Sequence, residues 1–232
     1  MRNLPVLLLF PAGVYVALCL MMFAVQRSQM YFPAREASRP GAQSIRVRSG
    51  HDSLKVWVVE RPGPRAILYF GGNAEDVSLN LPSFQAAFPA HSLYLVNYRG
   101  YGGSSGRPSE RALLADAIAV YDEVAARHPQ VSAIGRSLGS GVAVHLASAR
   151  EIQRLALVSP YDSMVNVARE HYPWLPVGLL MLDRFESSAK APAVRTPVFV
   201  VIAADDEIIP PRRSEALAAA FVRSQVRLVR LP

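Results

Sequence analysis

The chain has 232 residues, of which 51% are hydrophobic, and its formal net charge is +7. This length is sufficient for one domain with a substantial core. The single cysteine, Cys19, excludes an internal disulfide. The positive charge comes from scattered arginines rather than from one basic block, which argues against a nucleic-acid partner and favours a basic face turned towards anionic membrane lipid.

The amino-terminal segment is the first feature along the chain. Residues 4–25 contain no charged side chain, and at 1.5 Å per residue they span about 33 Å, enough to cross a hydrocarbon core of roughly 30 Å. We therefore expect residues 1–26 to form a single-pass membrane anchor. A cleaved signal peptide is the alternative, but its apolar region is usually only about 7–15 residues long, and residues 23–26 make a poor cleavage site.

The positive charges on the two flanks of this segment favour opposite orientations in the membrane. Arg2 and the amino terminus lie on one flank, and Arg27, Arg35 and Arg39 lie on the other. Taken literally, the positive-inside rule favours a cytoplasmic domain. The sequence alone leaves the side of the membrane open.

A polar, proline-containing linker over residues 27–43 leads into a domain that we expect to cover residues 44–232. Strand-like alternation over 44–49 and 54–60, separated by a Gly-His-Asp turn, predicts an antiparallel hairpin. Continuous apolar runs, which are typical of strands buried in a parallel sheet, follow at 66–70, 92–96, 131–134, 155–158 and 198–203. Residues 225–231 alternate and predict a final strand.

Helical patterns alternate with these strands. One begins at Pro108 and Ser109 and keeps an apolar face as far as Ala125, and others cover 138–149 and 214–222. The alternation predicts an α/β fold with a mostly parallel, doubly wound sheet. Residues 161–193 form an insertion with an apolar, proline-broken stretch. It is either a helix packed on the core or a cap lined with aliphatic side chains for an acyl substrate.

A Gly-x-Ser-x-Gly motif occupies residues 135–139, between the apolar run at 131–134 and the helical pattern that follows. In this context Ser137 would lie on a sharp strand-to-helix turn and serve as a nucleophile. Gly139 and Gly141 would let the helix pack close to the sheet, because small residues are needed there. An ordinary Ser/Gly turn is the plainer interpretation of the motif taken alone.

A serine nucleophile needs a histidine to accept its proton and an acid to orient that histidine. In this kind of fold the acid follows a later strand, and Asp206 lies just after the run at 198–203. Asp205 and Glu207 are its neighbouring competitors, and a solvated acidic loop is the plainer interpretation. The oxyanion hole needs two backbone amides, which we expect from Leu138 and from Asn73 in the Gly-Gly-Asn turn at 71–73.

The general base is the unmatched part of this pattern. Chain order asks for a histidine after Asp206, and no histidine follows His171. His171 lies in the predicted cap and could approach the site. Three explanations stay open: a truncated form of a longer protein, a natural pseudo-enzyme, or another group that substitutes for the histidine.

Several motifs taken together resemble a membrane-anchored, serine aminopeptidase-like branch of the α/β-hydrolase superfamily. They lie, in order, at residues 71–74, 97–102, 108–110, 135–141 and 206–210. The resemblance implies an α/β-hydrolase fold with Ser137 as nucleophile, Asp206 as triad acid, and Asn73 and Leu138 as oxyanion donors. Relatives usually carry His-Gly-Asn where this chain has Gly-Gly-Asn at 71–73, and they carry the base histidine beyond the acid.

The predicted function is that of a membrane-anchored serine hydrolase. Its substrate would be an ester, thioester or amide, with an acyl part, cleaved through an acyl-Ser137 intermediate. The alternative is a non-catalytic, membrane-anchored binding protein or an inactive form without the triad histidine. The expected partners are a small-molecule or lipid acyl substrate and membrane lipid. One cysteine and scattered histidines predict no metal site, and no sequence motif predicts a cofactor or an oligomeric state.

Overall fold

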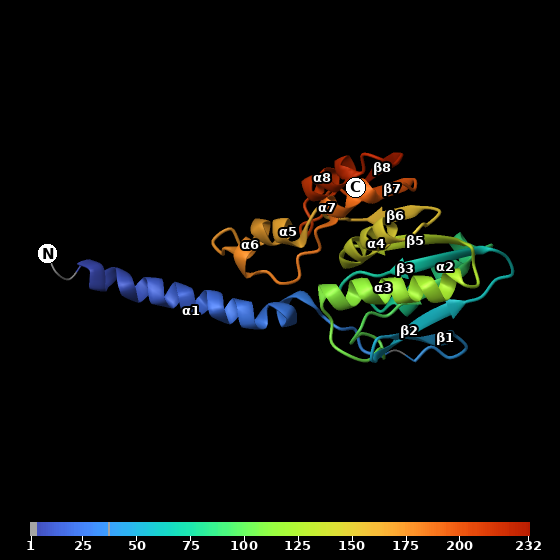
Figure 1. Cartoon of the computed structure of the whole chain (residues 1–232), viewed down its shortest axis with the longest axis horizontal. Helices are drawn as coiled ribbons and strands as arrows, with labels where there is room; N and C mark the ends of the chain where they lie inside the picture. The colour runs from blue at the N-terminus through green and yellow to red at the C-terminus, as the bar shows by residue number, and fades with distance from the viewer. Residues whose placement is uncertain (1–3, 37) are drawn as a thin grey trace.

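The computed structural model describes residues 4–36 and 38–232 and shows an eight-stranded sheet with helices on both faces, from which one long helix projects (Figure 1). Residues 1–3 of the predicted anchor, with Arg2, lie outside the described residues. The strand order is β1-β2-β4-β3-β5-β6-β7-β8. The strands are β1 (Gln43–Ser49), β2 (Asp52–Val59), β3 (Arg65–Phe70), β4 (Ser92–Val96), β5 (Gln130–Arg136), β6 (Leu155–Val158), β7 (Val198–Ala203) and β8 (Val226–Leu231).

The sheet is mostly parallel, as the continuous apolar runs predict. Only two pairings are antiparallel: β1 with β2, as a hairpin with Ser49 opposite Asp52, and β2 with β4, so β2 alone runs against the other strands. All pairings from β4 through β3 to β8 are parallel. The prediction of an α/β fold with an N-terminal hairpin is therefore confirmed.

Alternate residues of the central strands belong to two different apolar layers. In β3, Leu68 and Phe70 belong to the larger core cluster under the helices α3 (Glu110–Ala125), α4 (Leu138–Ala149) and α8 (Pro211–Ala220). Tyr69, between them, belongs to a smaller cluster under η1 (Val77–Asn80) and α2 (Leu81–Ala87). Side chains that alternate along a strand point to opposite faces, so the two layers lie on the two sides of the sheet.

Between β6 and β7 the chain forms a cap of short helices, in the region where the insertion at 161–193 was predicted. The cap helices are α5 (Met164–His171), α6 (Val177–Leu180), α7 (Ser187–Lys190) and η2 (Ala191–Ala193). Helix α5 begins at its N-cap Ser163, whose side chain accepts a hydrogen bond from the Asn166 N–H.

The projecting helix is α1 (Leu4–Met30), which continues four residues past the predicted end of the anchor at residue 26. The polar residues of this last turn are used in contacts rather than left in a linker. The Arg27 guanidinium pairs with Asp183 at 2.9 Å, and Tyr31 is buried in the main core cluster. In the described range, this helix contains one segment, Phe10–Met30, that is long and apolar enough to cross a membrane.

Candidate functional site

Ser137 lies between the end of β5 and the first turn of α4, with φ 48° and ψ −116°. A positive φ is rare for a residue with a side chain and costs on the order of 1–3 kcal/mol, so the surrounding structure must impose it. Two hydrogen bonds help to do so. The Ser137 N–H donates to the Val158 carbonyl at 2.9 Å, and the Ser137 carbonyl accepts from the Ser140 N–H at 2.9 Å. The hydroxyl-bearing side chain is half-buried at this turn.

The glycines of the motif allow α4 to approach the sheet. A Cβ on Gly139 would lie 2.5 Å from the Phe70 carbonyl carbon and 2.6 Å from the Gly71 carbonyl oxygen. A Cβ on Gly141 would lie 2.5 Å from the Tyr161 hydroxyl oxygen. Backbone atoms cannot move aside as a flexible side chain can. The expected need for a small residue beside the sheet is therefore confirmed at Gly139, whereas Gly141 makes room for the Tyr161 side chain rather than for the sheet.

A cavity of about 270 Å³ adjoins this turn and contains three of the four predicted site residues among its walls: Asn73, Ser137 and Leu138. The remaining walls are mainly apolar. They come from the end of α1, from the cap and from the loop after β7, including Met22, Met30, Val167, Leu175, Leu180 and Ile209. An apolar space of this kind suits an acyl chain or another aliphatic group.

The turn at residues 71–73 is held by the Glu75 carboxylate, which has a side-chain exposure of 11%. Its oxygens accept hydrogen bonds of 2.6 Å each from the Gly72 N–H, the Tyr69 hydroxyl and the Asn80 side-chain amide. Arg136, beside the serine, pairs with the same carboxylate at 3.3 Å. Nothing in the sequence motif indicated Glu75, because its role depends on where the turn folds back.

Asn73 connects this turn to the end of α1. Its side-chain amide donates to the Met30 carbonyl at 2.6 Å, and its side-chain oxygen accepts from the Phe32 N–H at 3.0 Å and from the Tyr101 hydroxyl at 2.8 Å. Among the described residues, no acceptor is bonded to the backbone N–H of Asn73 or of Leu138. These two donors thus keep their hydrogen-bonding capacity, whereas the Gly72 N–H is already used by Glu75.

Asp206 lies in the loop after β7, half-buried, and its carboxylate accepts from the N–H groups of Ile208 at 3.0 Å and Ile209 at 2.8 Å. Its neighbours Asp205 and Glu207 are exposed. Asp206 is not itself a wall of the cavity, although both isoleucines that it holds are. Its assignment as the triad acid stays a prediction.

His171, at the end of α5, reaches the same loop from the cap. Its Nε2 atom lies 2.9 Å from the Ile208 carbonyl oxygen. Of the five histidines in the sequence, all in the described part of the chain, His171 is the one that lines the cavity with Ser137. His145, in α4, is half-buried, and burial lowers its pKa below the ordinary value.

Two tyrosines of the motif at residues 97–102 donate hydrogen bonds to the turn at 71–73. The Tyr98 hydroxyl donates to the Gly71 carbonyl at 2.7 Å, and the Tyr101 hydroxyl donates to Asn73. Burial raises the pKa of both tyrosines above the ordinary value, so each phenol stays protonated and able to donate at neutral pH.

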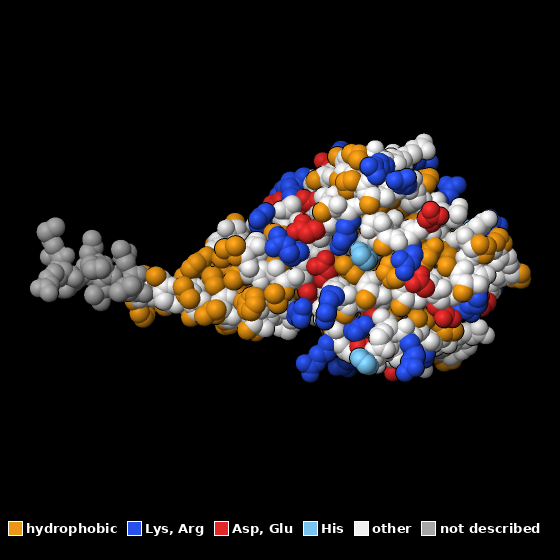
Figure 2. All heavy atoms as spheres, in the orientation of Figure 1, with side chains coloured by type: hydrophobic (Ala, Val, Ile, Leu, Met, Phe, Trp, Pro, Cys, Tyr) orange, Lys and Arg blue, Asp and Glu red, His pale blue; other side chains and the backbone are white. Residues whose placement is uncertain are grey.

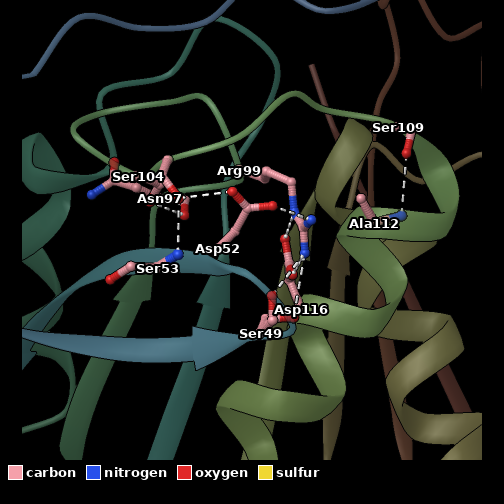
Figure 3. A network of polar contacts seen from close by, with 10 residues as sticks. Ser49, Asp52, Ser53, Asn97, Arg99, Ser104, Ser109, Ala112 and Asp116 are labelled. Carbon is pink, nitrogen blue, oxygen red and sulfur yellow. Dashed lines mark hydrogen bonds and ion pairs between the residues drawn. The ribbon is translucent and has the colours of Figure 1, made fainter.

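Arg99 fixes the same loop to the rest of the domain (Figure 3). Its guanidinium lies between two carboxylates: Asp116 on α3, whose Oδ2 is 3.1 Å from Nε, and Asp52 on β2, whose Oδ2 is 2.5 Å from Nη1. The Asp116 side chain is only 2% exposed. Helix α3 starts beside this network, where the Ser109 hydroxyl caps the Ala112 N–H at 3.3 Å.

A strained serine at a strand-to-helix turn, on a mostly parallel eight-stranded sheet, defines an α/β-hydrolase architecture. No family model matches the chain. The chain is 35% identical over 240 residues to the uncharacterized protein Rv2307c of Mycobacterium tuberculosis, with 94% of this chain and 83% of that protein covered. It is 33% identical over 189 residues to the alpha/beta hydrolase domain-containing protein aho-3 of Caenorhabditis elegans, with 77% of this chain covered. The match spans 55% of the length of aho-3.

Solved structures agree on the fold. The chain superposes on the esterase Pf2001 of Pyrococcus furiosus with a TM-score of 0.70 at 13% identity, which covers 86% of this chain and 88% of the esterase. The chain belongs to the α/β-hydrolase superfamily.

Within residues 4–36 and 38–232, no group of three or more His, Cys, Asp or Glu side chains is arranged to hold a metal ion.

Proposed function

We propose that this protein is a membrane-anchored serine hydrolase that cleaves an ester, thioester or amide with an apolar acyl part. The observation that carries the proposal is the strained Ser137 on the wall of an apolar cavity, beside two backbone N–H groups that have no acceptor in the described part of the chain. The hydrolase names among its relatives support the reaction class. Helix α1, with its apolar segment Phe10–Met30, is the proposed anchor.

In the proposed reaction, the Ser137 oxygen attacks the carbonyl carbon of the substrate while a base accepts the hydroxyl proton. The negative charge that develops on the carbonyl oxygen is stabilised by the N–H groups of Asn73 and Leu138. Collapse of the tetrahedral intermediate breaks the bond to the alcohol, thiol or amine, which leaves with that proton. Water then attacks the acyl-serine, releasing the acid and restoring Ser137. Asp206 is proposed to orient the base, and no cofactor is needed.

A fluorophosphonate probe tests the nucleophile directly. The full chain in detergent is labelled, digested and analysed by mass spectrometry. We expect one phosphonylated serine, Ser137, and no adduct on Ser140, which is buried three residues further along and donates to the Ser137 carbonyl at 2.7 Å. A chain that takes up no probe, or takes it up on another serine, would contradict the proposal and favour a non-catalytic binding protein.

Glu75 is proposed as a positioning residue for the oxyanion turn. Glu75→Ala leaves the Gly72 N–H and the Tyr69 hydroxyl without their acceptor, so we expect a loss of about 2–3 kcal/mol in unfolding free energy. Because one oxyanion donor then loses its position, we also expect kcat for acyl ester hydrolysis to fall roughly 10²-fold with little change in KM. Urea denaturation and steady-state kinetics measure the two effects.

The matched control is Glu123→Ala. The Glu123 carboxylate meets Arg127 at 3.6 Å on an exposed face of α3, so its loss is expected to change stability by less than about 0.5 kcal/mol. If Glu75→Ala and Glu123→Ala give the same stability and the same kcat, Glu75 does not position the turn.

A further inference from the structure

The apolar helix and the cap form one continuous surface. Tyr15 of α1 donates its hydroxyl to the Trp174 carbonyl at 2.9 Å. Further along α1, Cys19 packs in a cluster with Val165, Leu175 and Val177 of the cap. The helix is thus joined to the cap over a long part of the segment that is apolar enough to cross a membrane.

Polar contacts extend this junction to the end of α1. The Gln26 side chain donates to the Leu180 carbonyl at 3.1 Å and accepts from the Leu182 N–H at 2.8 Å. Arg27 pairs with Asp183. Because these contacts fix the cap alongside α1, the depth of the helix in a bilayer also sets the depth of the cap.

The cap presents large apolar side chains outward beside the helix. Trp174 is 51% exposed and Leu179 is 87% exposed, and Tyr172 and Leu182 are also exposed. On the face shown in Figure 2, hydrophobic side chains run along α1 and onto the adjoining edge of the domain, and charged side chains become frequent beyond that edge. Apolar area that continues from an apolar helix onto a neighbouring element marks a membrane or partner interaction site.

The spacing along α1 decides in favour of a membrane. Tyr15, which contacts Trp174, and Arg27 are twelve positions apart, so Trp174 lies about 18 Å along the helix from this arginine. A bilayer whose headgroups meet Arg27 therefore covers the level of Trp174 with acyl chains. Exposed Arg212 lies in the first turn of α8, on the domain, where an arginine meets headgroup phosphates.

We infer that the cap tip, defined as Tyr172, Trp174, Leu179 and Leu182, is a second membrane-inserting surface whose partner is the acyl layer of the bilayer. The inner faces of α1 and the cap are walls of the cavity at Ser137, and Met22 and Leu175 are among those walls. The apolar cavity therefore adjoins the surface that meets the acyl layer, and the acyl chain of a membrane-resident amphiphile can reach it from there without crossing water. This inference rests on the proposed function for its substrate class, and on α1 as the anchor for its geometry.

Tryptophan fluorescence tests the insertion independently of catalysis, because the chain has only two tryptophans. The full chain is reconstituted in phosphatidylcholine vesicles with or without bromine on the acyl chains. Trp57→Phe leaves Trp174 as the only tryptophan, and we expect brominated lipid to quench its emission by at least half. The matched variant Trp174→Phe leaves Trp57, which is 4% exposed on β2 within the domain, and we expect no quenching.

Quenching of Trp174 no stronger than that of Trp57, together with strong quenching by aqueous iodide, would overturn the inference. The unsubstituted chain supplies a check that does not depend on the folding of either variant. Its emission should be quenched in part by brominated lipid and should keep the contribution of Trp57. Emission that is unaffected by bromine would also overturn the inference.

A second experiment tests whether insertion of the cap tip is needed for hydrolysis of a substrate held in the membrane. Leu179 is not a wall of the cavity, and Leu179→Asp places a charge on the cap tip. We expect hydrolysis of a vesicle-borne acyl ester to fall about 10-fold or more, with hydrolysis of a short water-soluble ester unchanged. Val222→Asp, at an exposed apolar residue after α8, is the matched control and should alter neither rate. Equal vesicle rates for the two variants would contradict delivery from the bilayer.

Absence of hydrolase activity and absence of membrane insertion give different experimental results. A chain that takes up no fluorophosphonate but shows quenching of Trp174 is a membrane-inserted protein without the proposed hydrolase activity. A chain that is labelled at Ser137 but shows no quenching is a hydrolase whose cap tip stays in water.

Discussion

Replacing Ser137 by alanine is expected to lower kcat/KM for acyl ester hydrolysis by roughly 10⁴- to 10⁶-fold, because the covalent step has no other nucleophile. The substitution removes only the oxygen. The strained backbone at φ 48°, the cavity and the N–H groups of Asn73 and Leu138 all stay in place. Substrate affinity should therefore change little, and the residual rate should come from oxyanion stabilisation and binding alone.

The stability of Ser137→Ala should stay within about 0.5 kcal/mol of the unsubstituted chain, because no buried group among the described residues loses a hydrogen-bond partner. Ser148→Ala is the matched control. Ser148 lies on the same helix, and its hydroxyl donates only to the His145 carbonyl at 2.8 Å, within α4. It should retain the full rate. A Ser137→Ala chain that keeps more than about a tenth of the rate would exclude the acyl-serine mechanism.

Local sequence predicts the sheet and the serine turn well because their determinants are local. A strand buried on both faces is a continuous apolar run, as in β3 and β4, and Leu138–Ala149 forms a helix over the predicted residues. Gly139 is required by the close approach of α4 to Phe70, which is a feature of the sharp strand-to-helix turn that the motif encodes. The Gly-x-Ser-x-Gly pattern therefore predicts both the turn and the close packing of the helix that follows it.

The elements that the sequence did not predict depend on contacts between distant residues or on unusual helix starts. Helix α2 begins with Pro82 in its first turn, where proline is compatible with a helix, although proline otherwise argues for a loop. The packing of α1 against the cap depends on pairs such as Gln26 with Leu180, far apart in the sequence. An apolar helix carries the same local pattern whether it contacts lipid or a cap.

The candidate site was predicted in part for the same reasons. Asn73, Ser137 and Leu138 meet at one cavity because the ends of adjacent parallel strands β3 and β5 meet at one edge of the sheet. Glu75 was missed, since a glutamate two residues after a turn has no distinctive pattern until the turn closes on it. The roles of Tyr98 and Arg99 in supporting the turn also become apparent only in three dimensions.

Replacing Arg99 by methionine is expected to lower the free energy of unfolding by about 3–5 kcal/mol. Asp116 is 2% exposed, so removal of its partner leaves a buried carboxylate without a counter-charge. Asp52 also loses its contact with the guanidinium. The loss can be measured by urea denaturation in detergent. Arg150→Met removes the exposed Arg150–Asp122 pair, and it should cost less than about 1 kcal/mol.

The double variant Arg99→Met, Asp116→Leu separates the ion pair from the fold itself. Replacing both members by apolar side chains removes the unpaired charge, and well-packed apolar replacements of buried ion pairs are often neutral. We therefore expect it to recover most of the stability that Arg99→Met loses. Because Tyr98 and Tyr101 lie on either side of Arg99 and hold the turn at Gly71 and Asn73, we expect Arg99→Met to lower kcat as well, and the double variant to recover it. If Arg99→Met costs no more than Arg150→Met, the network does not hold this loop, and the support of the oxyanion turn must come from the two tyrosines alone.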